Sequence, residues 1–242
     1  MWIIIPCKRL ELAKLRLAPV LTTIERRGLV EAMLFDVLEA ATATQNIDGV
    51  MVVSSDPTVE KIAASFGAEC FSKHSDRGLS CALTAARTYL KSEAVNGVMT
   101  ISADLPSLSS SDISLVLASC QGDQSGICLA PATKDLGTNL VATSSASDIP
   151  YMFGNKSFNK HLSAARACGI EPTIIRRPGL GFDIDRPEDL LEFVEQVSVE
   201  PVALDKASKG RTFHYLQEFG IPGHFSRFKE SGSLNQVVER IC

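Results

Sequence analysis

The sequence predicts an α/β protein in which helices cover both faces of a mostly parallel sheet. The first observation behind this prediction is that 242 residues with 45% hydrophobic content can bury one substantial core. The second is a repeated alternation of short apolar runs with segments whose apolar residues recur at helical spacing. Because parallel strands need long crossover connections, this alternation favours a single-domain, three-layer αβα sandwich of the Rossmann-like type.

Strand and helix predictions alternate four times in the first part of the chain. An apolar run at 2–6 predicts a strand, and apolar residues at helical spacing from residue 25 onward predict the helix that follows. The second unit is a strand at 49–54 and a helix at 57–66, which begins with proline and ends before a glycine. The last two units are strand 68–72 with helix 79–90, and strand 97–102 with a helix at 113–117 behind a set of N-cap candidates.

The next part of the chain begins with two successive strand predictions, at 127–130 and 139–143. A helix at 158–168, a strand at 173–176 and a helix at 187–197 follow. Regularity falls after Pro201. We therefore divide the chain into a main domain at 1–200 and a C-terminal extension at 201–242, which packs on the core or forms the subunit contact of a homodimer.

Composition favours a small-molecule partner. The formal net charge is -4, with 24 basic and 28 acidic residues well mixed, which argues against nucleic acid or an anionic membrane as partners. No apolar run approaches the roughly 20 residues that span a bilayer, and the opening apolar stretch is too short for a signal peptide. We therefore expect a cytoplasmic protein.

Neither the cysteines nor the histidines form a pattern typical of a disulfide or metal site. The seven cysteines are an odd number without CxxC spacing, so buried thiols in a reducing compartment are the preferred interpretation. The four histidines lack metal-ligand spacing, and we interpret them as structural or surface residues; they are His74, His161, His214 and His224.

Three aspartates are candidate magnesium ligands. Asp104 follows the strand at 97–102, at the sheet edge where α/β proteins bind ligands. Asp183 and Asp185 are expected at a second strand end and are two residues apart, so in extended backbone both carboxylates face the same side. Hard Mg²⁺ favours such oxygen ligands. The alternatives are that Asp104 only forms a turn and that Asp185 only caps the helix predicted at 187–197.

Four cations stand between two prolines directly after the first strand: Lys8, Arg9, Lys14 and Arg16. Lysine and arginine neutralise the charge that builds up during phosphoryl or nucleotidyl transfer. A charge run is more often a solvated face. The position of this basic loop, directly after a buried strand, favours binding of a triphosphate.

Two glycine-hydroxyl pairs are candidate anion sites. Gly137 precedes Thr138, and Gly154 stands shortly before Ser157, where a helix is predicted to begin. A helix N-terminus with a free serine hydroxyl and backbone amides can hold an anion. Ordinary turn and N-cap chemistry is the alternative for both pairs.

Six segments of the chain, taken in order, carry a family resemblance: IPCKRLELAKLRLAP, ERRGLVEAMLFDVLEA, SADLPSL, GTN, FGNKSFNKHLSAA and PGLGFDIDRPEDL. Together they resemble the 2-phospho-L-lactate guanylyltransferase family of coenzyme F-420 biosynthesis, which includes phosphoenolpyruvate- and 3-phospho-D-glycerate-using members. The resemblance runs from Ile3 to about Leu191. It implies that the main domain is a GT-A-like nucleotidyltransferase, which transfers GMP from GTP to the phosphate of a three-carbon phospho acid, with Mg²⁺, and releases pyrophosphate.

The resemblance also implies roles for individual residues. The metal-binding acids are matched by Asp104, Asp183 and Asp185, and the positions associated with the acid substrate by Thr138, Gly154 and Ser157. The basic loop around the GTP phosphates is matched by Lys8, Lys14 and Arg16, which together with Asp104 make up the predicted catalytic set.

Two positions depart from the family pattern. Ser80, a candidate nucleotide-binding residue, stands where the family's Gly-Leu-Asn pattern places asparagine, which puts nucleotide contacts or acid selection near it in doubt. Leu136 stands where a second glycine is usual.

Two other functions are compatible with the sequence. Another nucleotidyltransferase of similar fold, such as a molybdopterin guanylyltransferase, would be expected to carry a glycine-rich loop after the first strand, where this chain has cations and no glycine. A non-catalytic nucleotide-binding protein would bind GTP without releasing pyrophosphate. No residue indicates which phospho acid is accepted.

Overall fold

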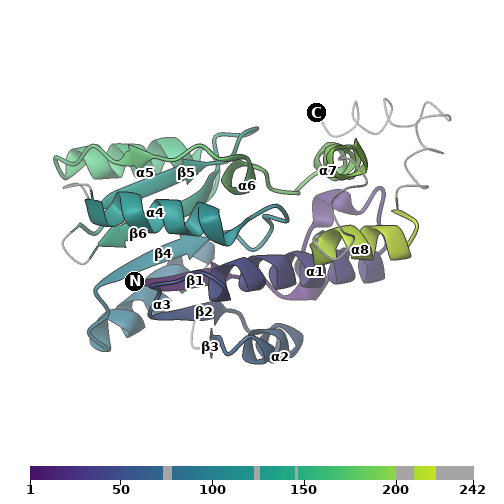
Figure 1. Cartoon of the computed structure of the whole chain (residues 1–242), viewed down its shortest axis with the longest axis horizontal. Coiled ribbons are helices and arrows are strands. Elements are labelled where there is room, and N and C mark those ends of the chain that lie inside the picture. The colour runs from purple at the N-terminus through teal and green to yellow at the C-terminus, as the bar shows by residue number, and fades with distance from the viewer. Residues whose placement is uncertain (73–77, 123–125, 145–146, 200–209, 222–242) are drawn as a thin grey trace.

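The computed structural model of the chain describes residues 1–72, 78–122, 126–144, 147–199 and 210–221 (Figure 1). A seven-stranded sheet lies at its centre, in the order β3-β2-β1-β4-β6-β5-β7. The strands are β1 (Trp2–Pro6), β2 (Gly49–Val53), β3 (Glu69–Phe71), β4 (Gly97–Ile101), β5 (Ile127–Pro131), β6 (Thr138–Ser144) and β7 (Thr173–Ile174). Strand β6 runs antiparallel to its neighbours β4 and β5, and all other neighbouring pairs are parallel. The predicted mostly parallel sheet is confirmed.

Helices cover both faces of this sheet. They are α1 (Thr23–Thr42), α2 (Pro57–Ser65), α3 (Leu79–Ser92), α4 (Ser110–Gly122), α5 (Ser157–Ala167), α6 (Pro178–Gly181), α7 (Pro187–Val199) and α8 (Arg211–Glu218), with 3-10 helices η1 (Leu10–Leu12) and η2 (Leu15–Leu17). Because successive strand residues point to opposite faces, Ile3 and Ile5 pack in the core under α1, α2 and α4, whereas Ile4 packs in the core under α3 and α5. The predicted three-layer sandwich is confirmed.

The two successive strand predictions form a hairpin of β5 and β6. The connection at 132–137 is far too short for a parallel crossover, so β6 must return antiparallel. Its first residue, Thr138, pairs with Pro131 at the end of β5, and Leu140 pairs with Ile101 at the end of β4. The start of β6 therefore lies at the same edge of the sheet as the carboxyl ends of its neighbours.

Four elements at this edge differ from the sequence prediction. The strand expected at 173–176 ends at Ile174, and the chain then forms the short helix α6. Glycine allows α6 to pack closely, because a Cβ on Gly179 would lie 2.5 Å from Asp112 Oδ2. The predicted basic loop contains the 3-10 helices η1 and η2, which hydrophobic periodicity does not reveal at three residues each.

The described part of the C-terminal extension includes α8, which lies alongside α1 (Figure 1). The carboxylate of Asp36 on α1 accepts hydrogen bonds from the backbone N–H groups of Arg211 and Thr212 at the start of α8. The Tyr215 hydroxyl donates to the Glu25 carbonyl at 3.0 Å. Most of 201–242 lies outside the described residues, as do His74, His224 and Cys242, so the domain boundary stays a prediction.

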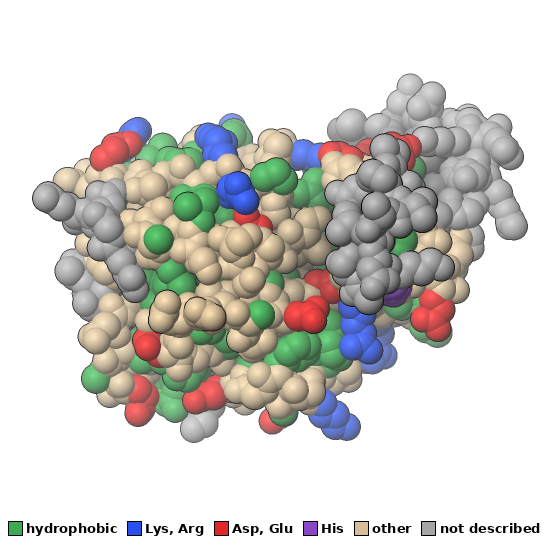
Figure 2. All heavy atoms as spheres, viewed as in Figure 1, with side chains coloured by type: hydrophobic (Ala, Val, Ile, Leu, Met, Phe, Trp, Pro, Cys, Tyr) green, Lys and Arg blue, Asp and Glu red, His purple; other side chains and the backbone are tan. Residues whose placement is uncertain are grey.

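Surface and cysteine chemistry are unremarkable over the described residues. None of the helices described here combines the length and apolar character needed to cross a bilayer. Acidic and basic side chains are interspersed with uncharged ones on the face shown in Figure 2. No disulfide joins any of the six cysteines in the described part of the chain. Burial, aided by Asp56, raises the pKa of Cys7 to about 12, which argues against a nucleophilic role.

Candidate active site

An acidic cluster of Asp104, Asp183 and Asp185 gathers around Lys14 at the carboxyl edge of the sheet. The ammonium of Lys14 lies 2.5 Å from Asp104 Oδ2 and 3.4 Å from Asp185 Oδ1. The side chain of Lys14 is only 9% exposed. Burial opposes its positive charge, but Asp104 and then Asp185 outweigh this effect and raise the pKa of Lys14. The lysine is therefore held in its charged form by the carboxylates.

Asp183 is joined to this cluster through the backbone and through Asn139. The Ile184 N–H donates to the Asp104 carbonyl at 3.2 Å, which fixes the two acid-bearing segments side by side. Asn139, buried near the start of β6, donates from Nδ2 to Asp183 Oδ1 at 3.1 Å. Burial first, and then the charge of Asp104, raise the pKa of Asp183 to about 6. The positive charge near Asp183 is thus too small to offset its burial and the charge of Asp104.

Asp185 faces the cations of the basic loop. Arg16 and Lys14 both form ion pairs with it. Although burial acts in the opposite direction, these two cations lower the pKa of Asp185. Asp189, and not Asp185, accepts from the backbone N–H groups that precede α7, at 3.0 Å from Asp185 N and 2.7 Å from Arg186 N. The alternative interpretation of Asp185 as the cap of that helix is therefore not favoured.

The placement of Asp183 and Asp185 differs from the prediction in one respect. The pair follows α6 and not a strand end, because the chain leaves β7 at Ile174 and makes a helical turn before reaching them. The hydrogen bond from Asn139 and the backbone bond from Ile184 bring the pair to the sheet edge. Proximity to Asp104 thus arises from tertiary contacts that a strand pattern does not encode.

The described residues contain no group of three or more acids, histidines or cysteines already arranged around a metal position. Lys14 instead places its ammonium against Asp104 and Asp185. One observation favours a further cation: Asp104 Oδ1 is buried and has no hydrogen-bond partner among the residues that the structure describes. A buried carboxylate oxygen without a donor is costly, and Mg²⁺ prefers such ligands. The donor set therefore fits magnesium, and the metal role of the three aspartates stays a prediction.

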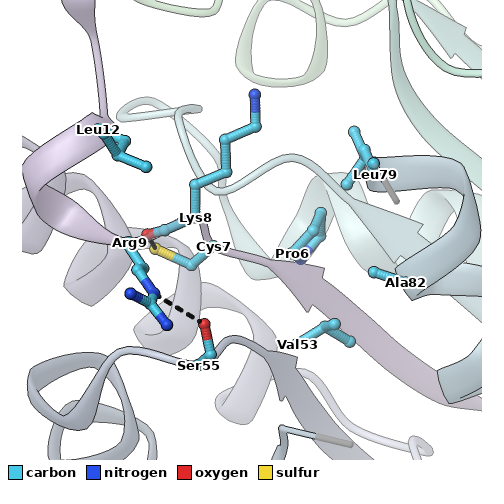
Figure 3. Close-up of a pocket in the computed structure, with 10 residues that line it drawn as sticks. Pro6, Cys7, Lys8, Arg9, Leu12, Val53, Ser55, Leu79 and Ala82 are labelled. Carbon is cyan, nitrogen blue, oxygen red and sulfur yellow. Dashed lines mark hydrogen bonds between the residues drawn. The ribbon is translucent and has the colours of Figure 1, made fainter. Parts of the chain in front are cut away.

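A pocket of about 400 Å³ opens next to the basic loop (Figure 3). Its walls come from the end of β1, the end of β2 and the start of α3, and include Pro6, Lys8, Val53 and Leu79. In Figure 3 the Lys8 side chain extends away from Ser55, whereas Arg9 donates from Nε to the Ser55 hydroxyl at 3.3 Å. A mostly apolar pocket of this volume, bordered by lysine, suits a base with attached phosphates.

Ser80 lies at the start of α3, beside the glycine and leucine that line this pocket. Its hydroxyl accepts a hydrogen bond from the Phe153 N–H at 3.0 Å. Phe153 directly precedes Gly154, one of the residues predicted to contact the acid substrate. The side chain therefore ties the pocket wall to a second loop, and its nucleotide-binding role stays a prediction.

The three predicted acid-substrate residues lie together, but not as the sequence pattern implied. The Ser157 N–H donates to the Gly154 carbonyl at 3.1 Å, and the Ser157 hydroxyl donates to Thr138 Oγ1, also at 3.1 Å. Ser157 is 2% exposed. The expectation of a free serine hydroxyl at the start of α5 is therefore wrong, because Thr138 on the adjacent strand occupies it. Gly154, with a φ of +117°, keeps a backbone conformation that favours glycine.

Sequence reasoning missed several residues that organise the site. Asn139 holds Asp183, and its position after Thr138 in the Gly-Thr-Asn segment was the available signal. Lys134 forms ion pairs with Asp189 at 2.7 Å and Glu192 at 2.6 Å, beside a second pocket of about 380 Å³ that Asp183 and Asp185 also line. No sequence pattern connects Lys134 to residues more than fifty positions away.

A solved structure shares the fold of this chain. A putative nucleotide-diphospho-sugar transferase from Desulfovibrio desulfuricans G20 superposes with a TM-score of 0.75 at 16% identity, covering 92% of this chain and 97% of that one. The chain therefore has the fold of that structure. Residues 1–238 match the family described as guanylyl transferase CofC like. The chain belongs to this family and is a guanylyltransferase.

Relatives of known name agree with this assignment. A phosphoenolpyruvate guanylyltransferase of Sphaerobacter thermophilus is 36% identical, over 81% of this chain and 93% of its own length. A 3-phospho-D-glycerate guanylyltransferase of Phenylobacterium zucineum is 33% identical over 74% and 83%. A 2-phospho-L-lactate guanylyltransferase of Methanothermobacter thermautotrophicus is 32% identical over 79% and 82%. The names of these relatives thus give three different acid substrates at nearly equal sequence identity to this chain.

Proposed function

We propose that this chain transfers GMP from GTP to the phosphate of a three-carbon phospho acid in coenzyme F-420 biosynthesis. The acid is phosphoenolpyruvate, 3-phospho-D-glycerate or 2-phospho-L-lactate, the substrates named for the relatives. The observation that carries the proposal is the juxtaposition of a buried cation, Lys14, with three carboxylates at the sheet edge beside a pocket for a base.

The pocket beside β1 is the proposed guanosine site. Lys8 lines it, and no ion pair engages its ammonium among the described residues, so this cation is available to a phosphate. Arg16, 59% exposed, is paired on one side with Asp185 and can also reach solvent-borne phosphate oxygens. Lysine as a point charge and arginine as a planar fork both stabilise a departing pyrophosphate.

Asp104, Asp183 and Asp185 are the proposed ligands of Mg²⁺. The orphaned Asp104 Oδ1 and the elevated pKa of Asp183 both indicate carboxylates that lack sufficient positive charge. Lys14 and Arg16 supply two positive charges against three carboxylates. When bound, magnesium would neutralise phosphate charge and polarise the α-phosphate.

The protein's own residues reduce the electrostatic repulsion between the two substrates and align them. A phosphate oxygen of the acid forms a bond to the α-phosphorus of GTP, while the bond from that phosphorus to the bridging oxygen of pyrophosphate breaks. The attacking oxygen is already an anion, so no residue has to remove a proton. The basic loop reduces repulsion between the two anions, and Thr138 with the Gly154–Ser157 turn orients the acid.

Purified protein tests this proposal directly. Incubation with GTP, Mg²⁺ and each of the three acids should release pyrophosphate with at least one acid and yield a product heavier than the acid by GMP. Both can be measured, by a coupled phosphate assay and by mass spectrometry. Absence of pyrophosphate with all three acids would refute the proposal, and GTP binding without turnover would support a non-catalytic role.

The metal assignment is tested by Asp183→Asn, which keeps the shape of the side chain. We expect the rate of pyrophosphate release to fall roughly 100-fold or more, because the variant removes a charge from the reaction centre. The rise in melting temperature that Mg²⁺ produces should also diminish. Asp148→Asn is the matched control, because Asp148 is an ion-paired surface aspartate beyond the opposite end of β6. Equal activity of the two variants would contradict the assignment.

A further inference from the structure

His161 is buried beneath the residues that we propose to contact the acid. It lies on α5 and is 0% exposed. Its Nε2 accepts a hydrogen bond from the Met152 N–H at 2.9 Å, and the Phe153 ring packs edge-on against it with centroids 5.0 Å apart. Its Nδ1 lies 3.0 Å from Thr138 Oγ1. The imidazole therefore connects the loop before α5 to the first residue of β6.

These contacts determine the tautomer of the ring. A backbone N–H can only donate, so Nε2 must be the unprotonated nitrogen. Burial lowers the pKa of His161 to about 4, so the ring is neutral near pH 7 and carries a single proton. That proton is on Nδ1. The hydrogen bond to Thr138 consequently has the imidazole as donor and the hydroxyl oxygen as acceptor.

Thr138 Oγ1 accepts twice. The Ser157 hydroxyl donates to it at 3.1 Å, in addition to the imidazole N–H at 3.0 Å. A hydroxyl group has two acceptor lone pairs and one donor hydrogen. Both lone pairs are now used, and the described residues provide no acceptor for the Thr138 hydrogen. The hydroxyl is therefore fixed as a donor.

We propose that His161 is a positioning residue that holds the Thr138 hydroxyl as a hydrogen-bond donor to an anionic oxygen of the phospho acid. This inference rests on the proposed function. A hydroxyl with both lone pairs occupied can donate to a carboxylate or phosphate but cannot accept from a hydroxyl of the acid. Thr138 therefore recognises an oxygen common to all three candidate acids and does not select among them. A histidine with a purely structural role would be equally buried, but its substitution would not change the affinity for the acid.

The tautomer can be measured on the unmodified protein. In ¹⁵N-labelled protein, two-bond correlations between the ring nitrogens and the carbon-bound ring protons distinguish the two neutral forms of histidine. We expect a single neutral form of His161 with the proton on Nδ1, unchanged from about pH 8 to about pH 6. A proton on Nε2, or a mixture of both forms, would overturn the inference without reference to any activity.

A pair of variants separates the two hydrogen bonds of the ring. Asparagine places an amide nitrogen at the position of Nδ1, and glutamine places an amide oxygen at the position of Nε2. His161→Asn thus keeps the donor to Thr138, whereas His161→Gln keeps only the acceptor for Met152. We expect His161→Gln to raise KM for the acid about tenfold or more, with KM for GTP unchanged, and His161→Asn to raise it much less. Equal KM values in both variants would refute the role of the Nδ1 donor.

A second pair covers the case in which His161 variants do not fold. Thr138→Val removes the hydroxyl at constant shape and should raise KM for the acid about tenfold or more. Thr44→Val is the matched control, because both threonines are 5% exposed and Thr44 lies beyond the end of α1, donating only to the Ala40 carbonyl. An unchanged KM in Thr138→Val would refute the inference. If the unmodified protein releases no pyrophosphate with any acid, the proposed function fails instead.

Discussion

At the scale of single residues, Asp183 and Asp185 show how the surroundings of a carboxylate determine its pKa. The two carboxylates are separated by one residue, yet the pKa of Asp183 is raised to about 6 and that of Asp185 is lowered. Both are partly removed from water, but only Asp185 has direct ion pairs, with Lys14 and Arg16. The same residue type therefore has a lowered pKa where cations contact it and a raised pKa where burial and a second carboxylate prevail, and the metal role of Asp183 stays a prediction.

Leu136 illustrates a residue that keeps a backbone shape better suited to glycine. Its φ is +58°, in the left-handed region, and its carbonyl accepts from the Phe158 N–H at 3.0 Å. The position at which a second glycine is usual has thus retained the glycine conformation, at a cost of about 1 kcal/mol. Loop chemistry of this kind is visible in the sequence only as a departure from the family pattern.

This strain predicts the outcome of Leu136→Gly. Relief of the left-handed strain should offset the added entropy of the unfolded chain, so the free energy of unfolding should stay within about 1 kcal/mol or rise. Leu115→Gly, at a similarly exposed leucine within α4, should lower it by about 1 kcal/mol. Urea denaturation of both variants makes the comparison. A larger loss at Leu136 than at Leu115 would contradict the explanation.

His161 predicts a pH dependence of stability. Burial, with a smaller contribution from the charge of Lys160, lowers its pKa from 6.5 to about 4, so below about pH 6.5 the unfolded chain takes up a proton that the folded protein excludes. The stabilisation is therefore complete above pH 6.5 and is lost as the pH falls toward 4. Between about pH 7.5 and about pH 5 the loss should be roughly 2 kcal/mol. In His161→Gln this part of the pH dependence should disappear, and an unchanged slope would refute it.

At the scale of elements, α8 depends on two features of α1. Asp36 caps its N-terminus, and Gly28 leaves room for Tyr215, since a Cβ there would lie 2.5 Å from the tyrosine ring. In each of these two contacts the residues are more than 170 positions apart in the sequence, so hydrophobic periodicity could not predict that α8 packs on α1. The extension at 201–242 was expected to pack on the core or at a subunit contact, and its described helix α8 packs on α1.

The docking of α8 can be tested through its cap. Asp36→Ala should expose the first amides of α8 and speed hydrogen exchange over 211–218, since loss of a cap costs about 1 kcal/mol and this one also bridges two helices. Exchange within the sheet should not change. Asp36→Asn keeps an acceptor oxygen and should behave more like the unmodified chain. Equal exchange in α8 for both variants would contradict the proposed cap.

At the scale of the whole molecule, the sequence was sufficient for the layers and for most elements. Strand β1 and helix α3 begin where the apolar patterns predicted, because each buries a continuous face. The reversed direction of β6 and the helix α6 were not foreseen, and neither was the choice of α1 as the element on which α8 packs, since each depends on contacts between distant segments. At the site, the acidic and basic residues converge as expected, but their order around Lys14 follows from tertiary packing.

The reversal of β6 has a consequence for how this protein can change over evolutionary time. Thr138 and Asn139 are neighbours on one strand, so Thr138 contacts His161 and Asn139 contacts Asp183 on opposite faces of the sheet. A one-residue insertion or deletion in 132–137 would exchange these faces and break both contacts at once. The loop can therefore tolerate changes of residue type, as Leu136 shows, far more readily than changes of length.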